Sequence, residues 1–432
     1  MSRFLPRACT ALLLALAAVV GHGRAAAETA ARVPAVLAPA SPESLGFSSA
    51  RLARLDRYID GEIAAQRKAG AVVLLARHGR IAYLKAYGAA DIASGRALRT
   101  DDYFRWWTMT KPITSVALLT LYEQGKFQLT DPVAKYIPAF GQVRVYTGVD
   151  ADGKLQLTDL VRPITIQDLF RHTAGLTYGG VFADTPVDKA YKAAGIAPFK
   201  LESLQEMVAK ITTVPLLYQP GTRYVYSYAH DVLAYLVEYF SGMRFDAYCQ
   251  QVIFAPLGMH ETAFGIPAGR EHRYSTSYRR GKDGGLEPST DAAGEDFYAY
   301  FNQHPSGGAG LGGPPRDYLR FAQMLLNGGE LGGVRILSPK TVELMTADNL
   351  VPGTPGVQDG MRHGLGVWVV TDVAQFGGLA SAGQYGRGGI ATTYFANDPK
   401  EQLVMLLFAQ YFPLDQPFVD TWMTLVYQAL VR

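Results

Sequence analysis

A hydroxyl residue and a lysine stand three positions apart in Thr108-Met109-Thr110-Lys111, where an apolar segment begins. Residues with this spacing are neighbours on one face of a helix, so the two side chains are expected to lie together. A partly buried lysine near cationic or dipolar groups can lose its proton and act as a base, which activates the hydroxyl as a nucleophile. Free backbone N–H groups at a helix start also favour a developing oxyanion. The same spacing suits a threonine N-cap followed by a solvated lysine, so it does not establish catalysis alone.

Other catalytic motifs find little support. The chain has no G-x-S-x-G, P-loop, H-E-x-x-H or C-x-x-C motif, and its eight histidines are scattered, so we expect neither a metal nor a cofactor. The run Gly308-Ala309-Gly310-Leu311-Gly312-Gly313 matches G-x-G-x-x-G, but it follows His304-Pro305-Ser306 and precedes two prolines. A dinucleotide site needs a strand before this motif, so we interpret the run as a tight backbone passage.

Five segments, in chain order, resemble the blocks of the serine β-lactamase-like family, which includes class C β-lactamases, DD-carboxypeptidases and family VIII carboxylesterases. Residues 104–115 resemble its S-M-T-K-P-I-T-S segment, with Thr108 in the place of the serine. Residues 124–133 resemble its E-x-G-K-L-x-L-D-D-P-V block, and residues 164–176 resemble its I-T-I-x-D-L-L-x-H-T-S-G-L block. Residues 220–228 resemble the segment with the Y-x-N tyrosine, and residues 386–395 resemble the late W-G-G or K-T-G block. The resemblance runs through nearly the whole mature chain, and the five blocks are highly specific as a set.

The resemblance implies a role for each matched position. Thr108 stands where the family has its nucleophile, and Lys111 and Tyr226 stand where it has its proton-handling residues. The backbone N–H groups of Thr108 and Ile390 match the oxyanion pair. A tyrosine, with a pKa of about 10 in water, needs nearby cations to act as a base, and Lys111 and Arg387 are candidates. His172 lies in a hallmark block outside the catalytic set, so we interpret it as structural.

The same blocks predict substrate contacts, and they contain the departures from the family pattern. The residues expected to contact substrate are Trp107, Tyr228, Arg387, Gly388 and Gly389. Threonine as nucleophile adds a methyl group that restricts χ1 and crowds the path of attack. Tyr228 replaces the amide that helps β-lactamases hold their substrate, and family VIII esterases also lack this amide, which favours esters. Arg387 replaces lysine or tryptophan and could pair with a substrate carboxylate, while Thr392 stands where glycine is usual.

The elements that must position these residues follow from apolar periodicity. The pattern predicts strands at both ends of the chain around a helical middle, which favours an α+β fold whose sheet joins N- and C-terminal segments. The resemblance implies a β-lactamase/transpeptidase-like fold with an antiparallel sheet and flanking helices. We assign residues of about 47–135 and 300–432 to the α/β part, and about 136–299 to the helical part. The predicted helices are 47–68, 111–123, 318–326 and 418–431, with shorter pieces near 167–170, 201–211 and 231–240; the predicted strands are 70–75, 81–84, 366–370, 391–396 and 403–409.

The N-terminus reads as a secretory signal peptide over residues 1–27, followed by a Pro/Ala/Ser-rich leader over 28–46. Arg3 and Arg7 precede a short apolar stretch and an A-x-A-like site, a pattern typical of export; an uncleaved anchor is the alternative. We expect a periplasmic or secreted protein without stable membrane insertion after cleavage. The mature chain holds one cysteine, Cys249, so no internal disulfide can form. The formal charge of only +3 gives no reason to expect nucleic acid as a partner.

Three hypotheses follow. The first is an exported hydrolase of short-chain carboxylic esters that works through an acyl-enzyme on Thr108. The second is an enzyme of the same mechanism acting on a D-amino amide, a D-amino peptide or a β-lactam, with Arg387 recruiting the carboxylate. The third is a catalytically weakened or inactive ligand-binding protein, which Thr108 keeps open. The sequence leaves the natural substrate and the oligomeric state undetermined.

Overall fold

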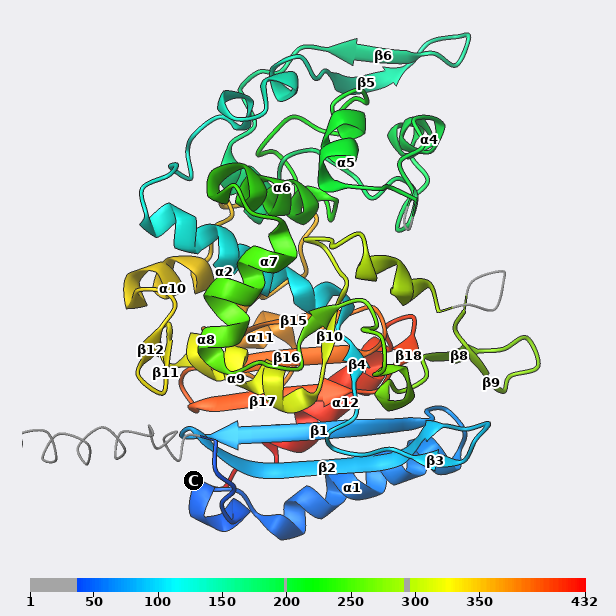
Figure 1. The fold of residues 1–432 in the computed structure, drawn as a ribbon, viewed down its shortest axis with the longest axis vertical. Helices are drawn as coiled ribbons and strands as arrows, with labels where there is room; N and C mark the ends of the chain where they lie inside the picture. The colour runs from blue at the N-terminus through cyan, green and yellow to red at the C-terminus, as the bar shows by residue number, and fades with distance from the viewer. Residues whose placement is uncertain (1–36, 198–199, 291–295) are drawn as a thin grey trace, which may run out of the picture. The chain divides into compact units, whose positions relative to one another are not determined.

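A computed structural model describes residues 37–197, 200–290 and 296–432 (Figure 1). The predicted signal peptide and the first nine residues of the predicted leader lie outside these ranges. The last ten leader residues instead belong to the compact unit Leu37–Arg432. They are held because the Ala40 N–H donates to the Ile81 carbonyl and Leu45 is buried. Within the described ranges, no helix has both the length and the apolar character needed to cross a membrane.

One eight-stranded antiparallel sheet joins the two ends of the chain, in the order β13-β14-β15-β16-β17-β1-β2-β3. The central pairing sets Val72 of β1 opposite Phe408 of β17, so the first long strand lies beside the last (Figure 1). The strands are β1 Gly70–Arg77, β2 Arg80–Asp91, β3 Arg96–Ala97, β13 Met361–His363, β14 Trp368–Val370, β15 Tyr385–Gly389, β16 Thr393–Asp398 and β17 Leu403–Phe408. The α+β prediction, with a sheet from N- and C-terminal segments, is confirmed.

Helices cover both faces of this sheet, which explains why β1, β16 and β17 are buried along their whole length. Helices α1 (Ser49–Ala64) and α12 (Gln416–Tyr427) share one apolar core with alternate residues of β1 and β17. Helix α9 (Pro315–Leu326) packs on β16 and β17, and α2 (Thr110–Glu123) carries the predicted reactive segment at its start. All four helices match predicted ones.

The middle region holds most of the remaining helices, and the three predicted pieces are confirmed as α3, α5 and α6. The helices not yet named are α3 Ile166–Phe170, α4 Pro186–Ala193, α5 Leu204–Ile211, α6 Ala229–Ser241, α7 Phe245–Cys249, α8 Ala255–Leu257, α10 Pro339–Thr346 and α11 Val373–Phe376. The short strands are β4 Phe104–Arg105, β5 Val145–Val149, β6 Leu155–Thr158, β7 Ala263–Phe264, β8 Tyr278–Arg280, β9 Leu286–Pro288, β10 Leu311–Gly313, β11 Glu330–Leu331, β12 Val334–Arg335 and β18 Tyr411–Phe412. The β5–β6 hairpin was not predicted, because its half-exposed strands lack an apolar run.

Asp168 anchors the loop that follows α3 and leads to His172. Its buried carboxylate accepts hydrogen bonds from Arg162, Arg171 and Thr173, and it completes a capping box with Thr165. Burial opposes ionisation of this carboxyl, but the hydrogen bonds from Arg162 and its neighbours outweigh burial and lower its pKa to about 2. Asp168 therefore fixes the loop, because Arg162, Arg171 and Thr173 would each lose a hydrogen-bond acceptor without it.

Replacing Asp168 with alanine is expected to cost about 3–5 kcal/mol in the free energy of unfolding, because it leaves the buried Arg171 without its ion partner. The folded-state pKa lies below the ordinary aspartate value of 3.8, so this stability is fully present above that pH and is lost as the pH falls through about 2. Urea unfolding of both proteins at neutral and acidic pH measures the difference, which should shrink in acid. Asp159→Ala, at an exposed ion pair, is the control and should change nothing measurable. An Asp168→Ala variant with the same free energy of unfolding as the wild type would contradict the anchoring role.

Candidate active site

Thr108 lies in a single 3-10 turn, η2 (Trp107–Met109), that runs directly into α2. Tyr226, two residues before the N-cap of α6, donates a hydrogen bond from its hydroxyl to Thr108 Oγ over 3.1 Å. The turn is held from behind, because the Tyr318 hydroxyl donates to the Met109 carbonyl and Leu311 N–H donates to Thr110 Oγ1. The structure thus brings together the predicted nucleophile and one of its two predicted proton-handling partners.

Lys111, the other predicted partner, is only 1% exposed. Its Nζ donates to the Tyr178 hydroxyl over 2.8 Å and to the Gly308 carbonyl over 2.7 Å, and it lies 4.7 Å from the centre of the Tyr226 ring. Burial lowers the pKa of Lys111, and the positive charge of Arg387 adds to this effect. Lys111 makes no hydrogen bond to Thr108, so the two act on each other through Tyr226.

Tyr226 lies between two cations. The Arg387 guanidinium carbon is 5.0 Å from the centre of its ring, and Lys111 lies against the same ring. Burial opposes ionisation of the Tyr226 hydroxyl, but the charges of Lys111 and Arg387 outweigh burial and lower its pKa to about 8. Tyr226 can therefore form a phenolate near neutral pH, as a base acting on Thr108 requires.

The glycine-rich run supplies a backbone carbonyl that accepts a hydrogen bond from Lys111. Besides the Gly308 carbonyl that accepts from Lys111, the Gly308 N–H donates to Asp231 over 3.1 Å, and the Ser306 hydroxyl also donates to Asp231. A Cβ at Gly308 would lie 2.7 Å from Asp231 Oδ2 and 2.9 Å from the Tyr178 hydroxyl. The interpretation of this run as a tight backbone passage is confirmed, and its carbonyl is a lysine partner that we did not predict.

Strand β15 supplies the opposite wall of the site. Arg387 and Gly388 lie on this strand, and Ile390 follows it directly. Gly389 is packed against the Trp106 carbonyl, which would lie 2.5 Å from an added Cβ, so only a residue without a side chain fits there. Thr392 adopts a φ of 53°, the left-handed region where glycine is usual, and its hydroxyl is tied to the Tyr411 carbonyl and the Asp415 N–H. The oxyanion role of Thr108 and Ile390 stays a prediction, and so do the catalytic roles and the substrate contacts expected of the other site residues.

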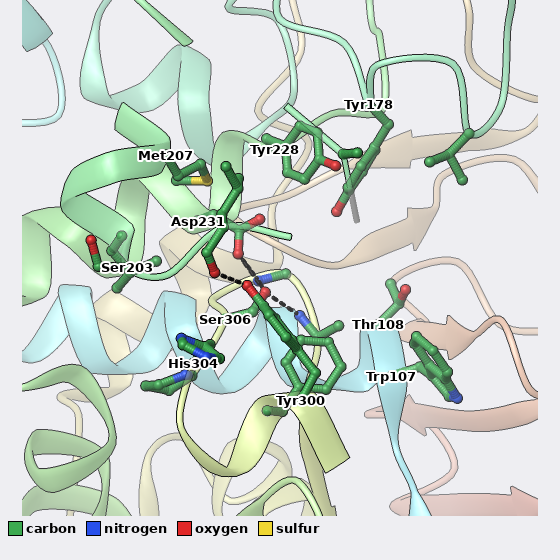
Figure 2. A pocket seen from close by; sticks show the side chains of 18 of the residues that line it. Trp107, Thr108, Tyr178, Ser203, Met207, Tyr228, Asp231, Tyr300, His304 and Ser306 are labelled. Atoms are coloured by element: carbon green, nitrogen blue, oxygen red, sulfur yellow. Dashed lines mark hydrogen bonds between the residues drawn. The ribbon is translucent and has the colours of Figure 1, made fainter. Parts of the chain in front are cut away.

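Two cavities open at Thr108. The larger, about 830 Å³, is lined by Thr108, Trp107 and Tyr228 among others; the smaller, about 670 Å³, is lined by Thr108, Arg387 and Gly388. Figure 2 shows Tyr178, Tyr228, Asp231 and Tyr300 around the larger cavity, with Thr108 and Trp107 at one side. Trp106 differs from its neighbour, since it is fully buried and donates its indole N–H to the Gly313 carbonyl.

Several residues in or behind the site were missed or classed as structural. Tyr178, Asp231 and Phe182 line the larger cavity, and no motif pointed to them. His172 is buried, hydrogen-bonds through Nδ1 to Ser227 and packs 4.9 Å from Tyr226, measured between ring centres. Burial holds the pKa of His172 well below its usual value, so it is neutral and supports the Tyr226 ring. The sequence indicated that a buried Lys111 would need a hydrogen-bond acceptor, but it did not indicate that Tyr178 would be that acceptor.

Comparison with known proteins identifies the family of the chain. The Beta-lactamase family pattern matches residues 55–429. Esterase EstB from Burkholderia gladioli is 32% identical over 301 residues, which cover 66% of this chain and 72% of EstB. A putative D-alanyl-D-alanine carboxypeptidase from Escherichia coli O157:H7 is 30% identical over 88% of this chain and 87% of its own. The structure of EstCE1, a hydrolase with promiscuous acyltransferase activity, superposes with a TM-score of 0.74 at 26% identity, over 88% of this chain and 99% of EstCE1. The chain that carries the Thr108, Lys111 and Tyr226 site therefore belongs to the Beta-lactamase family of hydrolases.

Proposed function

We propose that this protein hydrolyses carboxylic esters through an acyl-enzyme on Thr108. The observation that carries the proposal is the 3.1 Å hydrogen bond between Tyr226 and Thr108, made beside two buried cations. In the phenolate form, Tyr226 takes the Thr108 proton as Oγ attacks the ester carbonyl carbon. The proton then passes to the leaving alkoxide as the bond to it breaks. The same phenolate then takes a proton from a water molecule as the water oxygen attacks the acyl carbon. The bond from that carbon to Thr108 Oγ breaks, Oγ takes the proton back from Tyr226, and the carboxylic acid is released.

Esters are favoured over amides and β-lactams by the surroundings of Tyr228. Its hydroxyl is buried and finds no hydrogen-bond partner among the residues that the structure describes. Its ring lies 4.5 Å from that of Tyr178, centre to centre. The position from which an amide side chain would hold a substrate amide is thus filled by an aromatic ring. An ester does not need that hydrogen bond. D-amino peptides and β-lactams remain the second candidate class, with Arg387 at the smaller cavity as their carboxylate partner.

Covalent labelling tests the proposal. The full chain is mixed with p-nitrophenyl butyrate, quenched in acid and weighed intact, and the modified peptide is then sequenced. A butyryl adduct on Thr108, together with steady release of p-nitrophenol, is the expected result. Turnover of nitrocefin in preference to the ester would favour the β-lactam alternative. Saturable binding without any adduct, including after treatment with a fluorophosphonate, would identify a non-catalytic binding protein and overturn the proposal.

The pH dependence provides a second test. Because the base is the unprotonated form of Tyr226, kcat/KM should rise with pH and level off above a pKa of about 8. Arg387 lowers that pKa, so Arg387→Met should move the rising limb to higher pH. Measuring kcat/KM for the butyrate ester from acidic to alkaline pH at constant ionic strength shows the shift. Arg316→Met, at an exposed arginine, is the control. An unmoved limb in Arg387→Met would show that another group titrates.

A further inference from the structure

Thr108 lies where the two cavities meet. Four residues line both of them: Thr108, Phe182, Tyr226 and Ile390. The ester carbonyl carbon must come within bonding reach of Thr108 Oγ, and the acyl and alcohol halves extend from that point in different directions. Each half of the substrate therefore has a cavity of its own.

Most of the wall surface of the larger cavity is apolar or aromatic, although five charged side chains also line it; they are Glu202, Asp231, Glu238, Arg244 and Arg279. Tyr178 and Tyr228 lie on one side of it and Tyr300 on another (Figure 2). Phe301 and Met207 of α5 also line it. Its volume of about 830 Å³ is in the range of cavities that enclose ligands much larger than a short acyl chain. Flat aromatic walls favour a ligand that presents ring faces or edges.

A larger share of the wall surface is polar in the smaller cavity. Besides Thr108, Arg387 and His363, its polar side chains are Gln358, Gln416, Asp420, Thr421 and Thr424. Arg387 is buried and reaches Tyr226 from this side, so its positive charge favours an oxygen that becomes negative as the alcohol leaves. The alcohol departs and water enters between the two chemical steps, while the acyl half stays bound to Thr108. A polar cavity suits that exchange, and an apolar one suits the half that remains.

We propose that the larger cavity binds a bulky, ring-containing apolar acyl group and that the smaller cavity binds the more polar alcohol half. This inference rests on the proposed ester hydrolysis and replaces the short-chain expectation with a specific substrate class. Three neutral esters of similar reactivity separate the possibilities: ethyl acetate, ethyl 2-naphthylacetate and 2-(2-naphthyl)ethyl acetate. Ethyl 2-naphthylacetate is expected to have the highest kcat/KM, at least about 10-fold above ethyl acetate, because only it places the rings in the larger cavity.

Matched variants assign the cavities. Met207 of α5 and Met423 of α12 are both buried and line the larger and the smaller cavity, respectively. Met207→Trp should abolish the advantage of ethyl 2-naphthylacetate, so that its kcat/KM falls to about that of ethyl acetate in the same variant. Met423→Trp should preserve the advantage. Gln205→Trp and Thr424→Trp, at exposed positions lining the same two cavities, repeat the comparison if either methionine variant fails to fold.

Two results would overturn the assignment: a preference for 2-(2-naphthyl)ethyl acetate, or loss of the advantage in Met423→Trp. Binding separates this inference from the proposed chemistry. Calorimetry with 2-naphthylacetamide, a neutral compound that keeps the ring-containing acyl half, should show binding to Thr108→Ala and to Met423→Trp but not to Met207→Trp. If these variants bind 2-naphthylacetamide as expected but no ester hydrolysis depends on Thr108, the proposed ester hydrolysis is refuted and the assignment of the larger cavity to the ring-containing half still holds.

Discussion

Thr108→Ala is expected to lower kcat for ester hydrolysis by ~10³-fold or more and to eliminate the acyl adduct. The variant keeps Tyr226, Lys111 and Arg387, but it has no oxygen at the position 3.1 Å from the Tyr226 hydroxyl. A phenolate that has no hydroxyl to deprotonate can only activate water directly, without the entropic advantage of a bound nucleophile. Burst and steady-state release of p-nitrophenol, measured with intact mass, would show both losses together.

Thr108→Ser is the informative control for that result. The Thr108 methyl restricts χ1 and crowds the path to the carbonyl carbon, so its removal should raise kcat above that of the wild type. Both variants keep the surrounding turn, because its hydrogen bonds come from Tyr318 and Leu311 to the neighbouring residues. Equal activity in wild type and Thr108→Ala would place the nucleophile elsewhere. A Thr108→Ser that is slower than the wild type would show that the site is shaped for threonine.

The parts of this molecule that sequence reasoning predicted are those with a local signal. The β1–β2 hairpin follows from an apolar run, a His78-Gly79 turn and a second run. Helix α2 follows from its periodicity and its stop near Gly125. The pairing of Thr108 with Tyr226 is different, since the two are 118 residues apart. Only the resemblance to family blocks connected them.

The remaining parts depend on contacts that leave no local trace. Tyr178 and Gly308 reach Lys111 from 67 and 197 residues away, and neither lies in a recognised catalytic position. The need for such partners could be inferred, because a buried lysine must find hydrogen-bond acceptors, but their identity could not. The half-exposed β5–β6 hairpin was missed for a related reason, since its stability does not come from a buried apolar face.

Lys111→Met is expected to lower kcat/KM by about 10²–10⁴-fold, the range associated with loss of proton transfer, while making the fold more stable. The activity falls because Lys111 lowers the pKa of Tyr226, and without it the phenolate is scarce at neutral pH. Stability should rise because burial disfavours the Lys111 ammonium more than its interactions with Tyr226 and Asp231 favour it, so that its pKa is lowered. Its hydrogen bonds to Tyr178 and Gly308 go to uncharged groups. Burying an ammonium costs several kcal/mol, whereas two lost hydrogen bonds cost about 0.5–1.5 kcal/mol each.

Methionine fills nearly the same space without charge, so we expect a net gain of about 1–2 kcal/mol in the free energy of unfolding, measured by urea denaturation beside kcat/KM. Lys126→Met, at an exposed lysine just beyond the end of α2, should change neither quantity and serves as the control. Loss of activity together with loss of stability would mean that Lys111 acts mainly by holding the Gly308 segment in place through its hydrogen bond to the Gly308 carbonyl. A fall in kcat/KM together with a rise in the free energy of unfolding would mean that Lys111 destabilises the fold but keeps Tyr226 ionisable beside Thr108.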